Sequence, residues 1–286
     1  MSYEISDEEK LKIAVHFMLS SPPGEINEVL TDVRVLLDND NLLNQTALSA
    51  FREYNKSQMF ATELPELDYP LLITEYGELS PNTYLDPRSK RVYSFDHIQQ
   101  TFSGEFREAE NSEIFSAVED YRSAIDMAIN QYVFEYFADH SATVYEQKGK
   151  EIVICISAKK YSPQNYWNGT WRSVWKINIK NGKTKMKGTI KTLVHLYEAG
   201  NVQLNTLKEE SVDVTVSDPE STGTSIAKAI FETEHKYQKA LQLNYLEMGD
   251  TTFKSLRRKL PITGEKVNFY NIYSKKIIGE TSSGKK

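Results

Sequence analysis

The chain has 286 residues, of which 40% are hydrophobic and 26% charged, the balance of a folded protein and not of a disordered one. A single cysteine, Cys155, excludes a disulfide framework and a zinc site built from several thiolates. No apolar run is long enough to span a membrane, and the acidic N-terminus lacks the apolar core of a signal peptide, so we expect a cytoplasmic protein.

Charge is unevenly distributed along the chain. The net charge is −6, but the segment from Lys254 onward holds nine basic and two acidic residues, a net charge of +7 that leaves −13 on the preceding residues. A basic tail on an acidic body suggests an acidic partner, such as nucleic acid, a phosphoinositide surface or an acidic protein face. A solvated tail with no partner is the alternative that charge alone leaves open.

Residues 1–58 are predicted to form three helices. Ser6 and Glu9 match a capping box at the start of the first helix, and turn-forming residues interrupt the helical pattern at 20–24 and 38–41. Apolar residues recur at helical spacing in each segment between the interruptions. Short connections between amphipathic helices favour an antiparallel helical stalk.

Residues 59–110 are rich in proline and other turn residues, which predicts a small irregular globule whose candidate strands are 71–74 and 92–95. A long helix is predicted to follow, capped by Asn111 or Ser112 and apolar along one face as far as Tyr136.

Alternating apolar and polar residues between 143 and 207 predict an antiparallel meander of about five strands. The alternation places Trp171 and Trp175 on an apolar face, and Arg172 and Lys176 on a polar one. Asn181 and Gly182 predict a two-residue type I′ turn, and the last strand is expected over 202–207. A second long helix over 224–248 then gives an α+β fold with helices laid on one face of the sheet. The domains expected from this pass are 1–58, 59–110, 111–250 and a basic tail at 251–286.

The residues do not combine into a pattern typical of catalysis. The five histidines are not spaced as metal ligands, no glycine-rich phosphate loop or nucleophile elbow is present, and Cys155 lies in an apolar strand. We therefore predict no enzyme activity, no metal and no cofactor. The tryptophans beside Arg172 and Lys176 suggest a stacking platform for nucleic acid, but the apolar residues on their face favour a core role, so no nucleic-acid partner is expected.

Six segments, in order along nearly the whole chain, resemble the α subunit of the heterodimeric F-actin capping protein family. They are PPGEINEV at 22–29, DVRVLLDNDNLL at 32–43, LDPR at 85–88, NYWNGTWRSVW at 165–175, YEAGNVQL at 197–204 and DTTFKSLRRKLPIT at 250–263.

The resemblance implies an obligate heterodimer with a capping protein β subunit. The sheet is then shared between the two subunits, with helical stalks at one end and long helices over the sheet. It also implies calcium-independent binding to the barbed ends of actin filaments, which blocks subunit addition and loss. The expected location is the cytoplasm and its cytoskeleton.

In the family, basic residues that match Lys254 and Arg258 contact actin, and also bind the competing ligands phosphatidylinositol bisphosphate and myotrophin-like inhibitors. Proteins with a capping-protein-interacting motif are further expected regulators. The animal members have an arginine where this chain has Gly264, and Lys266 is the basic residue next to that position. The actin-binding residues expected here are Lys254, Arg257, Arg258, Lys259, Lys266, Val267, Tyr270 and Ile277.

The main alternative is a phosphoinositide-binding adaptor between membrane and cytoskeleton, which rests on the same basic tail. Such an adaptor would sediment with anionic vesicles without a second subunit or actin. A ligand-binding or enzymatic domain is a third class, which would need a pocket with convergent polar groups.

Overall fold

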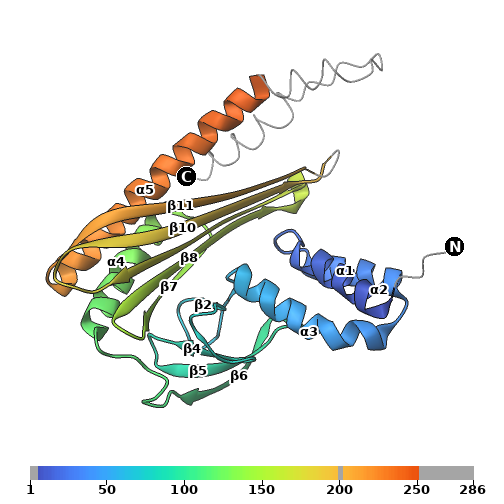
Figure 1. Cartoon of the computed structure of the whole chain (residues 1–286), viewed down its shortest axis with the longest axis horizontal. Helices are drawn as coiled ribbons and strands as arrows, with labels where there is room; N and C mark the ends of the chain where they lie inside the picture. The colour runs from blue at the N-terminus through green and yellow to red at the C-terminus, as the bar shows by residue number, and fades with distance from the viewer. Residues whose placement is uncertain (1–5, 199–201, 251–286) are drawn as a thin grey trace. The chain divides into compact units, whose positions relative to one another are not determined.

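The computed structural model describes residues 6–198 and 202–250. The chain divides into two compact units, residues 1–227 and 228–286. The first unit contains three helices at the N-terminus, a small four-stranded sheet, the helix α4 and a five-stranded sheet (Figure 1).

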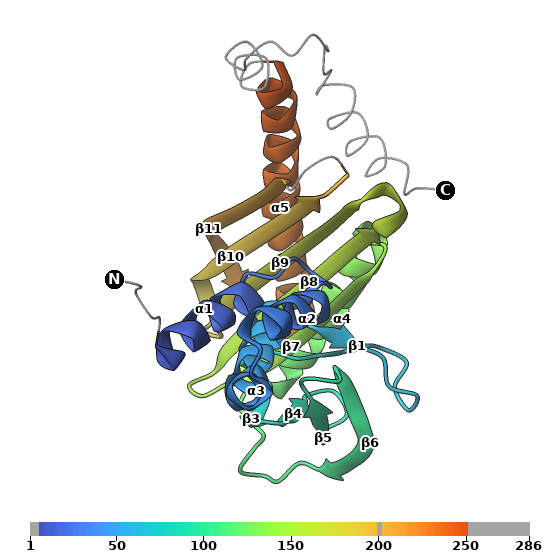
Figure 2. The same cartoon turned by 90° about the vertical axis from the view of Figure 1, so that its right-hand side faces the viewer.

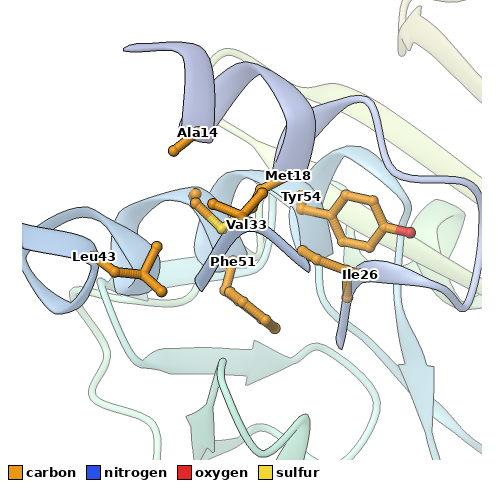
Figure 3. Close-up of a cluster of buried hydrophobic side chains, with 8 residues drawn as sticks. Ala14, Met18, Ile26, Val33, Leu43, Phe51 and Tyr54 are labelled. Atoms are coloured by element: carbon orange, nitrogen blue, oxygen red, sulfur yellow. The ribbon is translucent and has the colours of Figure 1, made fainter. Parts of the chain in front are cut away.

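The N-terminal helices are α1 (Asp7–Leu19), α2 (Ile26–Leu37) and α3 (Asp40–Ser57), as the sequence predicts (Figure 2). The capping box is present: the Glu9 N–H donates to Ser6 Oγ over 3.3 Å, and the Ser6 N–H donates to Glu9 Oε2 over 3.0 Å. Apolar side chains from all three helices meet between them (Figure 3). Because each such buried side chain contributes about 1.5–3 kcal/mol, this small core holds the three helices together.

Residues 59–110 are more regular than the sequence predicts. Two short strands, β1 (Ala61–Thr62) and β2 (Leu71–Leu72), pair with each other. An antiparallel sheet in the order β3-β4-β5-β6 follows, made of β3 (Glu78–Ser80), β4 (Thr83–Asp86), β5 (Arg91–Asp96) and β6 (Thr101–Glu108). The sequence predicted only the strands at 71–74 and 92–95, because turn residues interrupt the pattern elsewhere in this segment.

The helix α4 (Glu119–Tyr136) begins later than predicted, and neither Asn111 nor Ser112 caps it. Its N-cap residue, Val118, has no side chain that could accept a hydrogen bond. The carboxylate of Glu146, from strand β7 (His140–Gln147), instead accepts from the Ala117 N–H over 2.8 Å and the Val118 N–H over 3.2 Å. A negative charge at a helix N-terminus is favourable, so this helix is capped by the sheet on which it packs.

The large sheet is an antiparallel meander in the order β11-β10-β9-β8-β7 (Figure 1). Its further strands are β8 (Glu151–Ser162), β9 (Trp167–Asn178), β10 (Gly182–Leu196) and β11 (Val202–Val216), with a short 3-10 helix, Pro163–Asn165, before β9. The five predicted strands are therefore confirmed. The last strand runs to Val216, well beyond the expected end at 207.

The predicted division of the sheet into two faces is also confirmed. Trp175 is completely buried, and Trp171 is 9% exposed and contacts Phe137 at the end of α4. The tryptophans are therefore core residues and not a stacking platform. Lys176, on the opposite face of β9, is exposed.

The type I′ geometry expected at Asn181–Gly182 is wrong. Only Gly182 has a positive φ, of 96°, whereas a type I′ turn needs two such residues. The pairing of β9 with β10 starts only at Lys176 and Lys187, so the strands separate before the turn, but their register is the one that a two-residue turn at 181–182 sets.

The helix α5 (Pro219–Asp250) starts five residues before the predicted helix, and the boundary between the two units falls within it. In the first unit, Gly223 of α5 lies close to α4: a Cβ atom at this position would be 2.7 Å from the carbonyl oxygen of Ala124. In the second unit, the described residues 228–250 are helical.

Candidate functional site

The residues predicted to bind actin all lie outside the described residues. They are Lys254, Arg257, Arg258, Lys259, Lys266, Val267, Tyr270 and Ile277. The two residues predicted to bind phosphoinositides or inhibitors, Lys254 and Arg258, are among them. The described part of the chain therefore shows the scaffold from which this segment extends.

Two of the segments that carry the family resemblance meet in space. Glu25, in the loop between α1 and α2, is hydrogen-bonded to two residues on the polar face of the large sheet. Its Oε1 lies 2.9 Å from Nδ1 of His195 and accepts from Nδ2 of Asn168 over 3.0 Å. His195 and Asn168 are directly opposite each other on β10 and β9, and both are buried. One glutamate thus fastens the helical stalk to two strands.

Other contacts fix the same loop. The Tyr54 hydroxyl of α3 donates to the carbonyl oxygen of Pro22 over 2.8 Å. Gly24 has a φ of +82°, and a Cβ at this position would lie 3.2 Å from the ring of Tyr161, so the turn favours glycine both in its backbone and in its packing. An Arg172 N–H also donates to the carbonyl oxygen of Ser57, at the end of α3. The loop motif is therefore a structural joint.

The LDPR segment forms a second joint. Arg88 pairs with Asp126 of α4 through two hydrogen bonds, Nε to Oδ2 at 2.7 Å and Nη2 to Oδ1 at 3.0 Å. Burial opposes the charge on Arg88, but the hydrogen bonds and charge of Asp126 outweigh it and raise the pKa of the guanidinium. Asp86 accepts from the Tyr69 hydroxyl over 2.6 Å and from the backbone N–H of Arg88 over 3.2 Å. The small sheet is thereby fixed to α4.

Sequence reasoning identified these segments by resemblance but did not find their contacts. Glu25 and His195 are 170 residues apart, and Arg88 and Asp126 are 38 apart. The sequence does show a charged residue in each motif, Glu25 in the first and Arg88 in the second. A charged residue in a motif indicates that a charge is needed there, but not which residue it pairs with.

The described residues hold no group of three or more His, Cys, Asp or Glu side chains that could bind a metal ion. Cys155 is fully buried, and burial raises the pKa of its thiol, which makes it a poor nucleophile as expected. Among the described helices, none has both the length and the apolar character needed to cross a membrane.

The most open structural feature of the large sheet is its edge at β11. This strand pairs with β10 along its whole length, from Val202 opposite Leu196 to Val216 opposite Gly182, and has no strand on its other side among the described residues. A 15-residue strand with a row of unpaired backbone groups is a template for pairing with another chain. The fold thus defines an assembly scaffold, braced by buried polar joints and open at one sheet edge.

Comparison with known proteins agrees with this class. The family model described as "F-actin capping protein alpha subunit" matches residues 14–280. The chain is 41% identical over 280 residues to the F-actin-capping protein subunit alpha of Dictyostelium discoideum, an alignment that covers 96% of this chain and 98% of the relative. It is 38% identical over 270 residues to that of Caenorhabditis elegans, with 93% and 95% covered.

A solved structure has the same fold. The homodimeric actin capping protein alpha subunit from Plasmodium berghei matches with a TM-score of 0.72, over 90% of this chain and 99% of the other, at 20% sequence identity. The chain belongs to the F-actin capping protein alpha subunit family, a non-enzymatic actin-binding family that caps the barbed ends of actin filaments.

Proposed function

We propose that this chain caps barbed ends as one half of a heterodimer in which a capping protein β subunit continues the large sheet at β11. The free edge of β11 is the observation that carries this proposal. A similar strand aligned along this edge would satisfy its unpaired backbone groups and remove the risk of aggregation. The other edge strand, β7, is less available for pairing, because residues 70–76 already contact it. Side chains of Ser141 and Gln147 on β7 donate hydrogen bonds to this segment.

The family implies a β subunit and actin as partners. The contact with actin is proposed to come from the segment 251–286. Its charge of +7 would steer the complex toward acidic actin, and a stripe of apolar residues would then settle into a groove on the filament end. The residues proposed for this contact are Lys254, Arg257, Arg258, Lys259, Lys266, Val267, Tyr270 and Ile277.

This arrangement divides the chain by role: a stalk at 1–58, a small globule at 59–110, the sheet and its helices at 111–250, and the tail at 251–286. Capping would be independent of calcium and would stop both addition and loss of actin subunits. Phosphatidylinositol bisphosphate and myotrophin-like inhibitors would compete for Lys254 and Arg258. Proteins with a capping-protein-interacting motif would be further regulators, and the complex would act at the cytoplasmic cytoskeleton.

Size-exclusion chromatography with light scattering tests the assembly. The chain expressed alone should aggregate, and co-expression with the β subunit should give a 1:1 complex that separates only under denaturing conditions, since obligate interfaces resemble a domain core cut in half. The Plasmodium berghei α subunit is described as homodimeric, so a stable homodimer is the most instructive contrary result. A monodisperse monomer or homodimer of this chain alone would contradict the proposed heterodimer.

Deletion of residues 254–286 provides the second test. The truncated chain should still form the heterodimer and melt like the full-length complex, while losing most of its high-affinity capping. A truncated complex that melts normally and caps normally would refute the role of the tail. A truncated complex that fails to fold would show that the tail packs on the body.

A further inference from the structure

The polar face of the large sheet contains a hollow that the joints described above leave open. It has a volume of about 570 Å³ and lies between the end of α3, residues 74–76, and the strands β9 and β10. Small-molecule sites typically have volumes of about 300–1,000 Å³, so the hollow is of a size that takes a ligand.

The floor of the hollow is positively charged. Arg172 and Lys176 of β9 and Lys187 and Lys191 of β10 all line it. Lys187 is directly opposite Lys176, and Lys191 is directly opposite Arg172. Like charges in directly opposed positions of an antiparallel pair are destabilising, and this sheet places two such pairs on one face. The two pairs are four residues apart along each strand, a distance of roughly 13 Å.

The cations of the floor are only weakly neutralised by protein groups. No carboxylate of the described residues forms an ion pair with Lys187 or Lys191. Lys176 lies 4.9 Å from the ring centroid of Tyr76, a contact with an aromatic face and not with an anion.

Arg172 is the most constrained of the four. It is 6% exposed, and its Nε is buried without a hydrogen-bond partner, although one guanidinium N–H donates to the carbonyl oxygen of Ser57. Burial lowers the pKa of this guanidinium, because the charged form is held away from water. A buried arginine with an unsatisfied donor is a costly arrangement that an anion in the hollow would relieve.

The rim has the opposite charge. Glu53 of α3 and Glu75 line the hollow. Glu209 of β11 lies in the sheet itself, opposite Thr189 and between the two lysines of β10. Lys56, also at the rim, pairs with Glu78 over 3.1 Å and lies 3.7 Å from Glu53. An anionic membrane would be repelled by this acidic rim, whereas a small anion could pass between its side chains to the floor.

We propose that the hollow binds a soluble polyphosphate, a small molecule with at least two phosphate groups spaced to reach the two cation pairs. Each phosphate carries about −1.5 to −2 charges and three acceptor oxygens, so one phosphate matches one pair of cations. The fork of the Arg172 guanidinium fits a phosphate, which also supplies the acceptor that Nε lacks. A carboxylate side chain brings a single charge and would leave each cation pair half neutralised.

Isothermal titration calorimetry of the complex with its β subunit, at physiological salt, tests the proposal with inositol hexakisphosphate as the probe. The variant K187A/K191A should bind the probe at least about tenfold more weakly than the native complex. The matched control K180A/K183A changes two exposed lysines, one just before β10 and one at its start, and should stay within about twofold of the native affinity. In the absence of the probe, K187A/K191A should melt at the same or a higher temperature, because it removes the opposed charges.

Each other outcome overturns the proposal. Equal binding by K187A/K191A and by the control would assign the probe to the basic tail or to general surface charge. Absence of binding would mean that the hollow is filled by the β subunit or takes no anion. Binding to vesicles that contain phosphatidylinositol bisphosphate but not to the soluble probe would assign the lysines to a membrane surface. A loss of melting temperature in K187A/K191A without the probe would give the lysines a structural role instead.

Discussion

Gly188 of β10 lies directly opposite Trp175 of β9, and a Cβ atom at Gly188 would be 2.3 Å from two carbons of the indole ring. The ring is completely buried and lies over the strand at the position where a side chain would otherwise project. The absence of a side chain at Gly188 therefore makes room for the largest core residue of the sheet.

The Gly188→Ala variant should consequently be less stable. The added methyl group must displace a ring that has no space to move, and overpacking of this kind costs about 1–3 kcal/mol. The melting temperature of the complex, measured by circular dichroism at fixed concentration, should fall clearly.

Gly169→Ala is the matched control, because Gly169 lies in the same sheet, on β9, but a Cβ there would be 3.7 Å from its nearest neighbour, an ordinary contact. This variant should melt at or slightly above the native temperature. Equal melting of the two alanine variants would mean that the indole moves easily, contrary to the packing described.

Arg88→Met should destabilise the protein strongly. It leaves the buried carboxylate of Asp126 without its partner, and breaking a buried ion pair on one side costs about 3–5 kcal/mol. Arg34→Met breaks the exposed pair with Asp40 and should leave the unfolding midpoint in urea almost unchanged. If both variants shift the midpoint equally, the joint between the small sheet and α4 is not a stability element.

His97 should make stability depend on pH. The imidazole is buried, and burial is the main cause that lowers its pKa. The charges of Arg52 and Lys56 lower the pKa further, whereas the hydrogen bond to the carbonyl oxygen of Pro81 and the charge of Glu78 raise it. The folded state therefore holds the neutral ring, and the unfolded chain binds a proton near its ordinary pKa of about 6.5. The stabilisation is complete above that pH and is lost as the pH falls toward the lowered pKa of the folded state.

Melting temperatures at pH 7.5 and pH 5.5 check this prediction. His97→Gln removes the titrating group, so its loss of melting temperature between the two pH values should be smaller than that of the native protein. The Gln variant should also be less stable at pH 7.5, because Asn55 and Tyr84 lose their ring partner. An identical pH dependence in both proteins would show that His97 does not contribute.

Reversing two charges of the tail should weaken capping without affecting the fold. The variant K254E/R258E places two negative charges in the basic segment, so its association with acidic filament ends should be slower and less dependent on salt. The matched reversal K148E/K150E, in the exposed turn between β7 and β8, should cap at the native rate. Equal association rates for the two variants at low salt would argue against electrostatic steering by the tail.

The elements that the sequence predicted correctly are those whose signal is local. The helices α1–α3 and the five long strands carry their periodicity within a few residues, and the Ser6 cap is a contact over three residues. The start of α4 was misplaced because its cap, Glu146, comes from a strand 28 residues away. A local sequence pattern cannot predict a capping residue so far away in the chain.

The candidate site follows the same rule. The basic tail and the apolar residues within it are visible in the sequence, and an actin-binding site there stays a prediction from charge and resemblance. The contact between Glu25 and His195 joins residues 170 apart in the sequence, so no local pattern could predict it. The opposed cations of β9 and β10 follow from the predicted turn, because a two-residue turn at 181–182 places Lys176 opposite Lys187 and Arg172 opposite Lys191, as the sheet does.

Elongation of actin from filament seeds tests the central claim most directly. Growth at barbed ends is followed by microscopy in the presence of the complex of this chain with its β subunit, with calcium chelated. We expect barbed-end growth and shrinkage to stop at concentrations far below that of actin, while pointed ends continue to grow. Barbed ends that elongate at the uncapped rate in a large excess of the folded complex would contradict the assignment.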